Sequence, residues 1–518
     1  MAVFEITIAL LVVGAILSLF ADRVGVPYPA LLALAGALLA LVPGTPTVTL
    51  DPELALALFV APVLVDAAYD ASPRDLRANI IPVSTLAIVV VALTIAAVAL
   101  AVRAVVPSIP WAAAITLGAI VAPPDASAAT AVLKKLRPPH RMMVILEGES
   151  LFNDASALLA YRIAVGAAMT GAFSGWSLLP TLLLTCGGGA IVGILLARAI
   201  LWLTTRITDL QVAIIMQFVA SFAVWIIAER LGLSAIITTV AFAMTAARIA
   251  PGRTGGRARI SSYAVWDVVV FVMNVLAFVL IGLQLRGIAQ RIEDGEWQIY
   301  LIAAGAVCLT AIVVRIVWVM SYTTVLRWKI RHFGSRGTLM KPTFGGGILI
   351  SWSGMRGIVT LAAALALPDG FPHRDLIVFC AFCVVLVTLV VQGMTLGPLL
   401  RRLGLQDDGS VERELSIARE ETAKAALAAL QAQEPRAAAE ILRREYQARI
   451  RPDVCEPEAL ATLQQRAVQA QRRALLDLRA RDIIGDDAFH AAEEEIDLLE
   501  LTADPRVRPN LPATDRAT

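Results

Sequence analysis

Residues 147–168 read EGESLFNDASALLAYRIAVGAA, a cluster of polar residues that opens a long apolar run with a single later charge. An apolar run of about this length can cross a bilayer as a helix. An ionisable side chain inside such a helix is costly and marks a functional or paired group, so Asn153 and Asp154 are the first candidates. With 3.6 residues per turn, Ser150 and Asp154 share one face of the predicted helix. Glu149 and Asn153 share a neighbouring face.

The rest of the chain is apolar in the same way. It has 518 residues, of which 58% are hydrophobic and 17% charged, and its mean hydropathy is +0.74. A water-soluble protein of this length would carry more charge. Uncharged stretches that reach or approach the roughly 20 residues of a spanning helix are 80–102, 104–124, 210–228, 268–285 and 376–400. Because membrane strands are shorter and alternate in polarity, we predict an all-α polytopic membrane protein.

The spans can be counted and oriented from their boundaries. Proline, glycine and charge divide residues 1–405 into thirteen predicted transmembrane helices, centred near residues 11, 36, 60, 91, 118, 158, 190, 220, 241, 275, 308, 354 and 387. An odd number places the termini on opposite sides, and cytoplasmic loops are enriched in Lys and Arg. On this division seventeen Lys and Arg residues lie in loops on the carboxyl-terminal side and five on the other. We predict a multi-pass protein of the cell (inner) membrane with its N-terminus outside and its C-terminus in the cytoplasm.

The composition changes after Leu400 from apolar residues to Ala, Glu, Arg and Gln. We therefore predict two domains, a membrane domain at 1–405 and a charged, helical cytoplasmic tail at 406–518. Within the tail, residues 411–432 are good helix formers, and the proline-containing end from Leu501 is predicted to be disordered. The tail is interpreted as a solvated appendage, with a regulatory or dimer-contacting role as the alternative.

Two further motifs interrupt predicted spans that run in opposite directions. Residues 122–127 read APPDAS, in which two prolines remove backbone donors and block helical geometry. Residues 351–357 read SWSGMRG, in which glycines flank an arginine. Two broken helices in oppositely directed spans are typical of transporters built from inverted repeats. Asp125 and Arg356 are predicted to neutralise the half-helix ends in mid-membrane.

Asp154 is then the carboxylate without an obvious dedicated partner. A carboxylate that faces water can bind a proton or a hard cation, and competition for one such site exchanges one ion against the other. The alternative is that Asn153 and Asp154 form a polar pair between packed helices. Asp66, which ends the motif PVLVD, is either a functional carboxylate inside its span or the cap of a helix end near Arg74 or Arg77.

Three motifs together resemble the bacterial sodium/proton exchangers of the monovalent cation:proton antiporter-1 family. They are GAIVAPPDASAA at 118–129, EGESLFNDA at 147–155 and GMRG at 354–357, in the family's order and spacing, and the resemblance covers roughly residues 1–405. It implies a homodimer in which a core of six helices, with two crossed broken helices, moves against a dimerisation domain like an elevator. It implies no cofactor.

The resemblance also implies roles for individual residues. Asp154 resembles the carboxylate that binds the cation and accepts the proton, Ser150 a cation ligand, and Asn153 the polar residue that stabilises the site. Asp66 stands in the place of a glutamate that contributes to the ion site in some members, and its shorter side chain implies a bridging water. Pro124 stands where the family usually has the threonine of Thr-Asp-Pro, so only a backbone carbonyl is available as a ligand there.

The resemblance further implies a structural ion pair. Glu149 resembles the glutamate that pairs with the core arginine, which is Arg356 in this chain. Arg315, the lone charge of its span, is interpreted as a snorkelling or helix-packing residue. The Asn153-Asp154 pair has one carboxylate fewer than the Asp-Asp pair of electrogenic relatives, which implies electroneutral, one-for-one exchange.

We expect a secondary antiporter that exchanges protons for a monovalent cation by competition at Asp154, with sodium as the cation and potassium or lithium as alternatives. A cation channel is the competing class, but it would need a continuous polar pore, which the apolar spans do not offer. An enzyme is not expected, because the sequence has no Cys/His metal cluster, nucleophile motif or phosphate-binding loop. Expected partners are the transported ions, membrane lipid and a second copy of the chain, and not nucleic acid.

Overall fold

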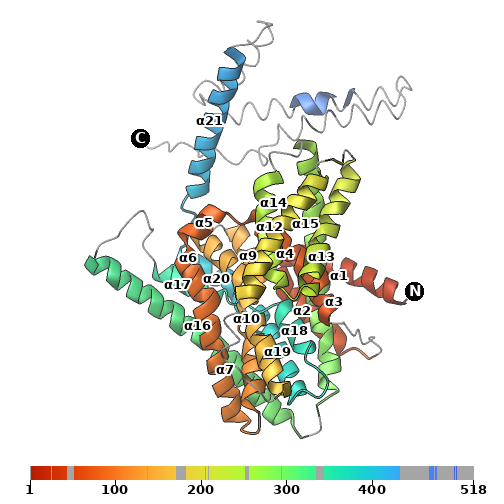
Figure 1. Cartoon of the computed structure of the whole chain (residues 1–518), viewed down its shortest axis with the longest axis vertical. Coiled ribbons are helices and arrows are strands. Elements are labelled where there is room, and N and C mark those ends of the chain that lie inside the picture. Colours follow the sequence, from red (N-terminus) through yellow and green to blue (C-terminus); the bar gives the residue numbers. More distant parts are fainter. Residues whose placement is uncertain are drawn as a thin grey trace. The chain divides into compact units, whose positions relative to one another are not determined.

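The computed structural model is helical and contains no strand in the residues that it describes (Figure 1). These residues are 2–24, 26–43, 52–136, 138–170, 183–204, 206–207, 209–250, 256–292, 295–333 and 343–431, with 466–471, 473–474, 495 and 498 near the C-terminus. The chain divides into two compact units, Met1–Asp408 and Gly409–Thr518. The second unit contains the helix α21 (Ser410–Gln431).

The helices of the first unit follow one another along the whole membrane domain, and η1, η2, η4 and η6 are single π-helical turns within longer segments. Up to residue 170 they are α1 (Ala2–Val24), α2 (Tyr28–Ala40), α3 (Pro52–Ala55), η1 (Leu56–Val60), α4 (Ala61–Asp70), α5 (Pro73–Ala78), α6 (Ile80–Ser84), η2 (Thr85–Val90), α7 (Val91–Val105), α8 (Trp111–Val121), α9 (Ala126–Leu136) and α10 (His140–Thr170). The later ones are η4 (Leu183–Gly187), α12 (Gly188–Thr204), α13 (Leu210–Arg230), α14 (Ala235–Ile249), α15 (Gly256–Ala289), α16 (Trp297–Phe333), α17 (Phe344–Trp352), α18 (Ile358–Leu365), α19 (Arg374–Val387), η6 (Thr388–Gln392) and α20 (Gly393–Leu403).

These helices match the predicted spans closely. Twelve of the thirteen predicted centres fall inside a helix, and the other, residue 354, falls at a predicted break. Within the part of the chain that the structure describes, six continuous helical segments are long and apolar enough to cross a membrane by length and composition. The all-helical membrane fold is therefore confirmed.

Several helices begin where a side chain can cap them. Capping side chains accept a hydrogen bond from the backbone N–H three residues later, which satisfies a donor that has no partner inside the helix. The capping residues are Ser72 before α5, Asp209 before α13, Ser234 before α14 and Thr343 before α17.

Both predicted helix interruptions are present. The first covers residues 122–125 between α8 and α9, and the second covers residues 353–357 between α17 and α18. The two breaks touch, because the Asp125 backbone N–H donates a hydrogen bond of 2.6 Å to the Met355 carbonyl oxygen. Four half-helix ends, with their partial charges, therefore meet at one place in the bundle.

The buried apolar residues form two main clusters. The larger one surrounds the breaks and includes Ile120 and Met355. The second lies among α4, α12, α13 and α14 and includes Val224. Helix α10 contributes Leu146 to the first cluster and Leu151 to the second. The polar residues of α10 are therefore held between two apolar regions.

Close packing of α2 against α15 depends on two glycines. A Cβ atom at Gly36 would collide with the Val279 carbonyl oxygen, and one at Gly282 would collide with the Ala33 carbonyl oxygen. Small residues of this kind let helix backbones approach in membrane proteins. A larger side chain at either position would force the two helices apart.

Candidate ion-binding site

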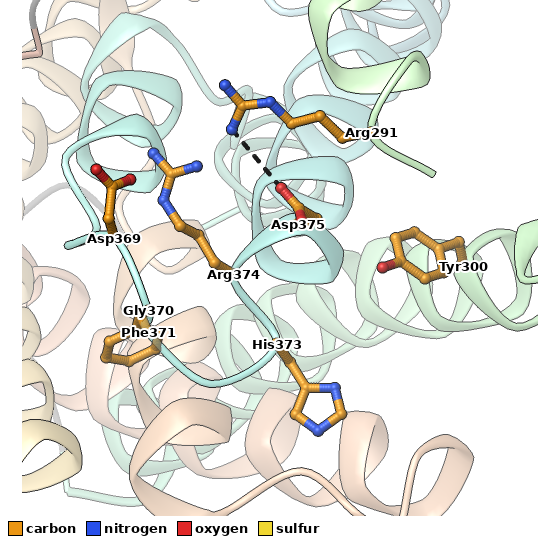
Figure 2. A pocket seen from close by; sticks show the side chains of 8 residues that line it. All are labelled: Arg291, Tyr300, Asp369, Gly370, Phe371, His373, Arg374 and Asp375. Carbon is orange, nitrogen blue, oxygen red and sulfur yellow. Dashed lines mark ion pairs between the residues drawn. The ribbon is translucent and has the colours of Figure 1, made fainter. Parts of the chain in front are cut away.

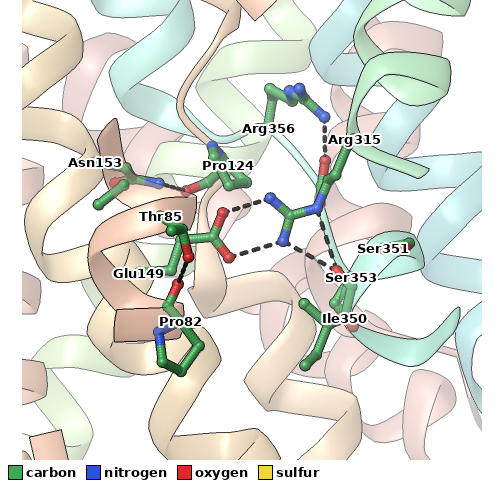
Figure 3. Close-up of polar contacts among 12 residues, drawn as sticks. Pro82, Thr85, Pro124, Glu149, Asn153, Arg315, Ile350, Ser351, Ser353 and Arg356 are labelled. Carbon is green, nitrogen blue, oxygen red and sulfur yellow. Dashed lines mark hydrogen bonds and ion pairs between the residues drawn. The ribbon is translucent and has the colours of Figure 1, made fainter. Parts of the chain in front are cut away.

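Asn153 ties α10 to the first helix break. Its side chain is fully buried, and its Nδ2 atom donates a hydrogen bond of 2.8 Å to the Pro124 carbonyl oxygen (Figure 3). Its Oδ1 atom is also buried but has no hydrogen-bond partner among the described residues. A buried amide oxygen without a partner is costly, which makes it available to a bound ion or water.

Asp154 lies next along the same helix and is 9% exposed. Among the residues that the structure describes, it has neither a hydrogen-bond partner nor an ion-pair partner. The charged group that acts on it electrostatically is Asp125, of the same sign. Ser150 is half-buried one turn earlier on α10, as the helical spacing predicted. The described residues contain no group of three or more His, Cys, Asp or Glu side chains that could hold a metal ion.

Asp125 acts as a cap in the first break. Its Oδ1 atom accepts a hydrogen bond of 2.8 Å from the Ser127 backbone N–H, in the first turn of α9. Its carboxylate also lies against Gly357, where any Cβ atom would collide with it. A carboxylate at a helix N-terminus is stabilised by the helix dipole. Asp125 therefore has the capping position that the sequence predicted for it.

Arg356 caps the opposite kind of helix end. Its Nε atom donates a hydrogen bond of 3.0 Å to the Val121 carbonyl oxygen, the last residue of α8, and its Nη1 atom donates to the Gly354 carbonyl oxygen. Its backbone N–H donates 3.0 Å to the hydroxyl of Thr388, a residue that the sequence analysis did not single out. A buried guanidinium that satisfies carbonyl oxygens at a helix C-terminus is again a structural group.

The predicted Glu149–Arg356 pair is wrong, because Glu149 pairs with Arg315. Arg315 Nη2 donates 2.8 Å to Glu149 Oε2, Nη1 donates to Oε1, and both side chains are 2% exposed (Figure 3). Arg315 also donates 3.2 Å from Nε and 3.0 Å from Nη2 to the Ile350 carbonyl oxygen. The snorkelling interpretation of Arg315 is therefore wrong, whereas the alternative, a helix-packing residue, agrees with these contacts of α16 with α10 and α17.

The physical reason for this correction is the cost of burying a charge. A guanidinium inside the bundle must have a counter-charge and hydrogen-bond acceptors, and α16 brings Arg315 to α10 across 166 residues of sequence. Arg356 had carbonyl oxygens of the two breaks as acceptors and did not need a carboxylate. The signal in the sequence was the lone charge of Arg315 in an apolar span, which requires a buried acid, but Arg356 gives the same signal.

Asp66 is not brought next to Asp154. It is half-buried on α4, and it lines a cavity of about 340 Å³ between α4 and the segments α12 to α15. Neither Asp154 nor Ser150 lines that cavity. Asp70, Asp267 and Lys134 are the charged groups that act on Asp66 electrostatically. The sequence placed Asp66 in the ion site by resemblance, and the structure places it at a separate cavity.

A second, more polar pocket lies at the connection between α18 and α19, with a volume of about 430 Å³ (Figure 2). Arg291 Nη1 lies 3.7 Å from Asp375 Oδ1 at its edge, and both side chains are well exposed. Arg374 donates hydrogen bonds to the Leu367 and Leu365 carbonyl oxygens at the end of α18. None of the motif residues lines this pocket, so it is separate from the candidate site.

The fold and the site together define a class of protein. Two broken helices that touch at their breaks and a buried carboxylate without a partner among the described residues, within an all-helical membrane bundle, are the features of a secondary ion transporter. The family model for the transmembrane region of sodium/hydrogen exchangers matches residues 7–402. The chain belongs to the sodium/hydrogen exchanger family, whose members are transporters that exchange cations for protons.

Individual relatives and one solved structure agree with this assignment. An uncharacterized Na⁺/H⁺ exchanger of Mycobacterium tuberculosis is 32% identical over 528 residues, which cover 95% of this chain and 94% of that protein. The sodium, potassium, lithium and rubidium/H⁺ antiporter of Bacillus pumilus is 33% identical over 397 residues, 72% of this chain and 58% of that protein. The sodium proton antiporter MjNhaP1 of Methanocaldococcus jannaschii is similar in fold, with a TM-score of 0.58 at 18% identity over 77% of this chain and 98% of that one.

Proposed function

We propose that Asp154 is the carboxylate of this exchanger that binds a proton and a monovalent cation in turn. The observation that supports the proposal is its burial without a hydrogen-bond or ion-pair partner in the described part of the chain, beside the like charge of Asp125. A charged carboxylate in that position is costly, so a bound proton or cation stabilises it. Because either ion neutralises the same group, the two compete, and the gradient of one drives the other.

The oxygen atoms around Asp154 supply the remaining ligands. The Asn153 Oδ1 atom is buried and has no partner in the described part of the chain, and the Ser150 hydroxyl lies one turn away on the same face as Asp154. Hard cations prefer oxygen ligands of this kind. The Pro124 carbonyl oxygen accepts from Asn153 and retains a second lone pair for the cation. Asp66 acts further away, as a carboxylate on the route to the site through water.

The stoichiometry follows from the number of uncommitted carboxylates. Asp125 caps α9 and Glu149 is paired with Arg315, which leaves Asp154 as the carboxylate of the site that can change its occupant. The single negative charge of Asp154 carries one proton in one direction and one monovalent cation in the other. The same net charge therefore crosses the membrane in each direction. The exchange is therefore electroneutral, with a ratio of one to one.

Sodium is the proposed cation, and potassium is the second candidate. The printed name of the Bacillus pumilus relative includes sodium, potassium, lithium and rubidium. In this chain Pro124 provides a carbonyl oxygen and no hydroxyl at the first break, so one side-chain ligand is missing there. A site with fewer fixed ligands discriminates less by size, which favours lithium and potassium as additional substrates.

The transport cycle is proposed to be an elevator movement within a homodimer in the inner membrane, with the N-terminus outside and the tail in the cytoplasm. The breaks are held together by the Asp125–Met355 hydrogen bond and by Arg356, so they can move as one body with α10. Asp154 crosses the barrier only when a proton or cation neutralises it, because an unpaired charge in the apolar region is too costly.

Exchange in proteoliposomes tests this proposal. Each alkali cation is added in turn, and proton movement is followed with a pH-sensitive dye for the wild type, Asp154→Asn and Asp375→Asn, an exposed carboxylate in the pocket of Figure 2. We expect Asp154→Asn to lose exchange with every cation and Asp375→Asn to retain it. Full exchange by Asp154→Asn would contradict the proposed site. A rate that changes with an imposed membrane potential would contradict the one-to-one ratio.

A further inference from the structure

Of the residues that line the cavity of about 340 Å³ beside Asp66, the exchange mechanism described above uses Asp66 and no other. It lies between the ends of α4, α12 and α14 and the beginnings of α13 and α15, and we call it the α4–α15 pocket. None of the described residues of α8, α9, α10 or the two breaks lines it. Its volume is in the range of sites that bind small organic molecules.

One wall of the α4–α15 pocket is apolar and rigid. The Trp266 ring stacks on Phe218 with 4.4 Å between ring centroids, and its Nε1 atom donates 3.1 Å to the Gln217 Oε1 atom. The Ser262 hydroxyl donates 2.6 Å to the same oxygen. These contacts hold the indole in one orientation, and Phe242 completes an aromatic and aliphatic surface around it.

A second wall, formed by α4, carries two carboxylates. Asp66 and Asp70 are one turn apart on α4, so they share a face of the helix. Neither of them forms a hydrogen bond or an ion pair with any part of the chain that the structure describes. This separates them from Glu149, whose charge is fully matched by Arg315.

The charges around the pocket have a negative excess. Among the residues that line it, Asp66 and Asp70 are the acidic groups and Arg259 is the basic one. Two carboxylates against one guanidinium leave one negative charge of the lining uncompensated. A ligand that complements both walls therefore has one positive charge and an apolar body.

We propose that the α4–α15 pocket binds an amphiphilic organic cation of the arylalkyl-ammonium type. The ammonium group would bind between Asp66 and Asp70, where each carboxylate offers charge-assisted hydrogen bonds. The aromatic part would lie against Trp266 and Phe242, where apolar contact and the ring faces favour a cation. A bound cation would also lower exchange by covering Asp66, and this second consequence rests on the proposed function.

Direct binding to the purified full-length protein tests the pocket without any ion gradient. Calorimetry compares 2-phenylethylammonium with 2-phenylethanol and 3-phenylpropionate, which have similar shapes but no charge or a negative charge. We expect the ammonium to bind about tenfold or more tightly than the alcohol, the ratio for loss of one charge-assisted hydrogen bond. We expect no binding of the carboxylate.

Four variants locate the binding site. Asp70→Asn removes a carboxylate, and we expect it to weaken ammonium binding about tenfold. Ala246→Phe fills the cavity and leaves both carboxylates in place, so we expect it to abolish ammonium binding. If the Ala246→Phe protein does not fold, Ile214→Trp fills the same cavity. Asp375→Asn, in the other pocket, should bind as the wild type does.

Three outcomes would overturn the proposal. Equal affinity for the alcohol and the ammonium would show an apolar site without charge recognition. Unchanged ammonium binding in both Asp70→Asn and the cavity-filling variant would place the ligand elsewhere. Loss of ammonium binding in Asp154→Asn would place it at the ion site. Ammonium binding that persists in Asp154→Asn, when exchange is lost, supports the pocket and the proposed function separately.

Discussion

Glu149 and Asp154 are five residues apart on α10, and their surroundings are opposite. Both are buried, with exposures of 1% and 9%. Glu149 is held by both terminal nitrogens of Arg315, whereas Asp154 has no hydrogen-bond or ion-pair partner among the described residues and faces the like charge of Asp125. A carboxylate whose charge is permanently matched is structural, and one whose charge is unmatched is free to take an ion. The difference between them separates the scaffold from the site.

The largest effect is expected from breaking the matched pair. Arg315→Met leaves the Glu149 charge buried without a partner, which costs about 3–5 kcal/mol for a buried ion pair. We expect a large fall in the apparent melting temperature in detergent and poor recovery of folded protein. Arg291→Met, which removes an exposed arginine 3.7 Å from Asp375, is the matched control and should have little effect.

Removing both charges of the pair should restore part of the lost stability. In the double variant Glu149→Gln with Arg315→Met no charge remains to be buried without a partner, so the melting temperature should rise above that of Arg315→Met alone. A double variant no more stable than Arg315→Met would show that the guanidinium acts through its bonds to the Ile350 carbonyl oxygen instead.

The two carboxylates should also differ when each is neutralised singly. Glu149→Gln leaves the Arg315 charge without its partner, so we expect a loss of about 3 kcal/mol. Asp154→Asn removes an unmatched charge, so we expect an unchanged or higher melting temperature together with loss of exchange. Thermal unfolding of both variants at one pH measures the contrast. Equal destabilisation by the two substitutions would contradict the division into scaffold and site.

A smaller effect is expected from the amide that joins α10 to the first break. Asn153→Ala removes the 2.8 Å hydrogen bond to the Pro124 carbonyl oxygen and should cost about 1–2 kcal/mol. We expect a modest fall in melting temperature and a higher cation concentration for half-maximal exchange, because Oδ1 is lost as a ligand. Thr324→Val, which removes an exposed hydroxyl bonded within its own helix, is the control.

The smallest effect is expected at a third carboxylate, Asp75 on α5, which contacts the beginning of α10. His140 Nε2 lies 3.3 Å from its Oδ2 atom. Burial raises the pKa of Asp75, but hydrogen bonds from His140 and Arg74 outweigh it, and the pKa lies below its ordinary value. Because the folded-state pKa is lowered, the ionised Asp75 carboxylate contributes to the free energy of unfolding at neutral pH. This contribution is lost as the pH falls through the folded-state pKa.

This contribution should be less than about 1 kcal/mol, because the pair is partly exposed. The melting temperature of Asp75→Asn should therefore lie slightly below that of the wild type at pH 7, and the gap should close at acid pH. A gap that widens as the pH falls would contradict the assigned sign.

Much of the fold could be predicted because its signals are local. Two consecutive prolines before Asp125 lack backbone N–H donors, and the glycines on both sides of Arg356 weaken the helix there; both breaks are present. Helical spacing likewise placed Ser150 and Asp154 on one face. The partner of Glu149 could not be predicted in this way. Arg315 and Arg356 were both lone arginines in apolar spans, and only their acceptors differ.

The sequence by itself determined the all-helical membrane fold, the two breaks and the position of Asp154 in an apolar helix, because hydrophobicity and backbone restriction act within a few residues. The tertiary structure alone decided that Glu149 pairs with Arg315, that Arg356 caps α8, and that Asp66 lines a separate cavity. The physical reason is that the partner of a buried charge is set by which helices pack together. Which carboxylate remains unmatched is therefore a property of the packed bundle.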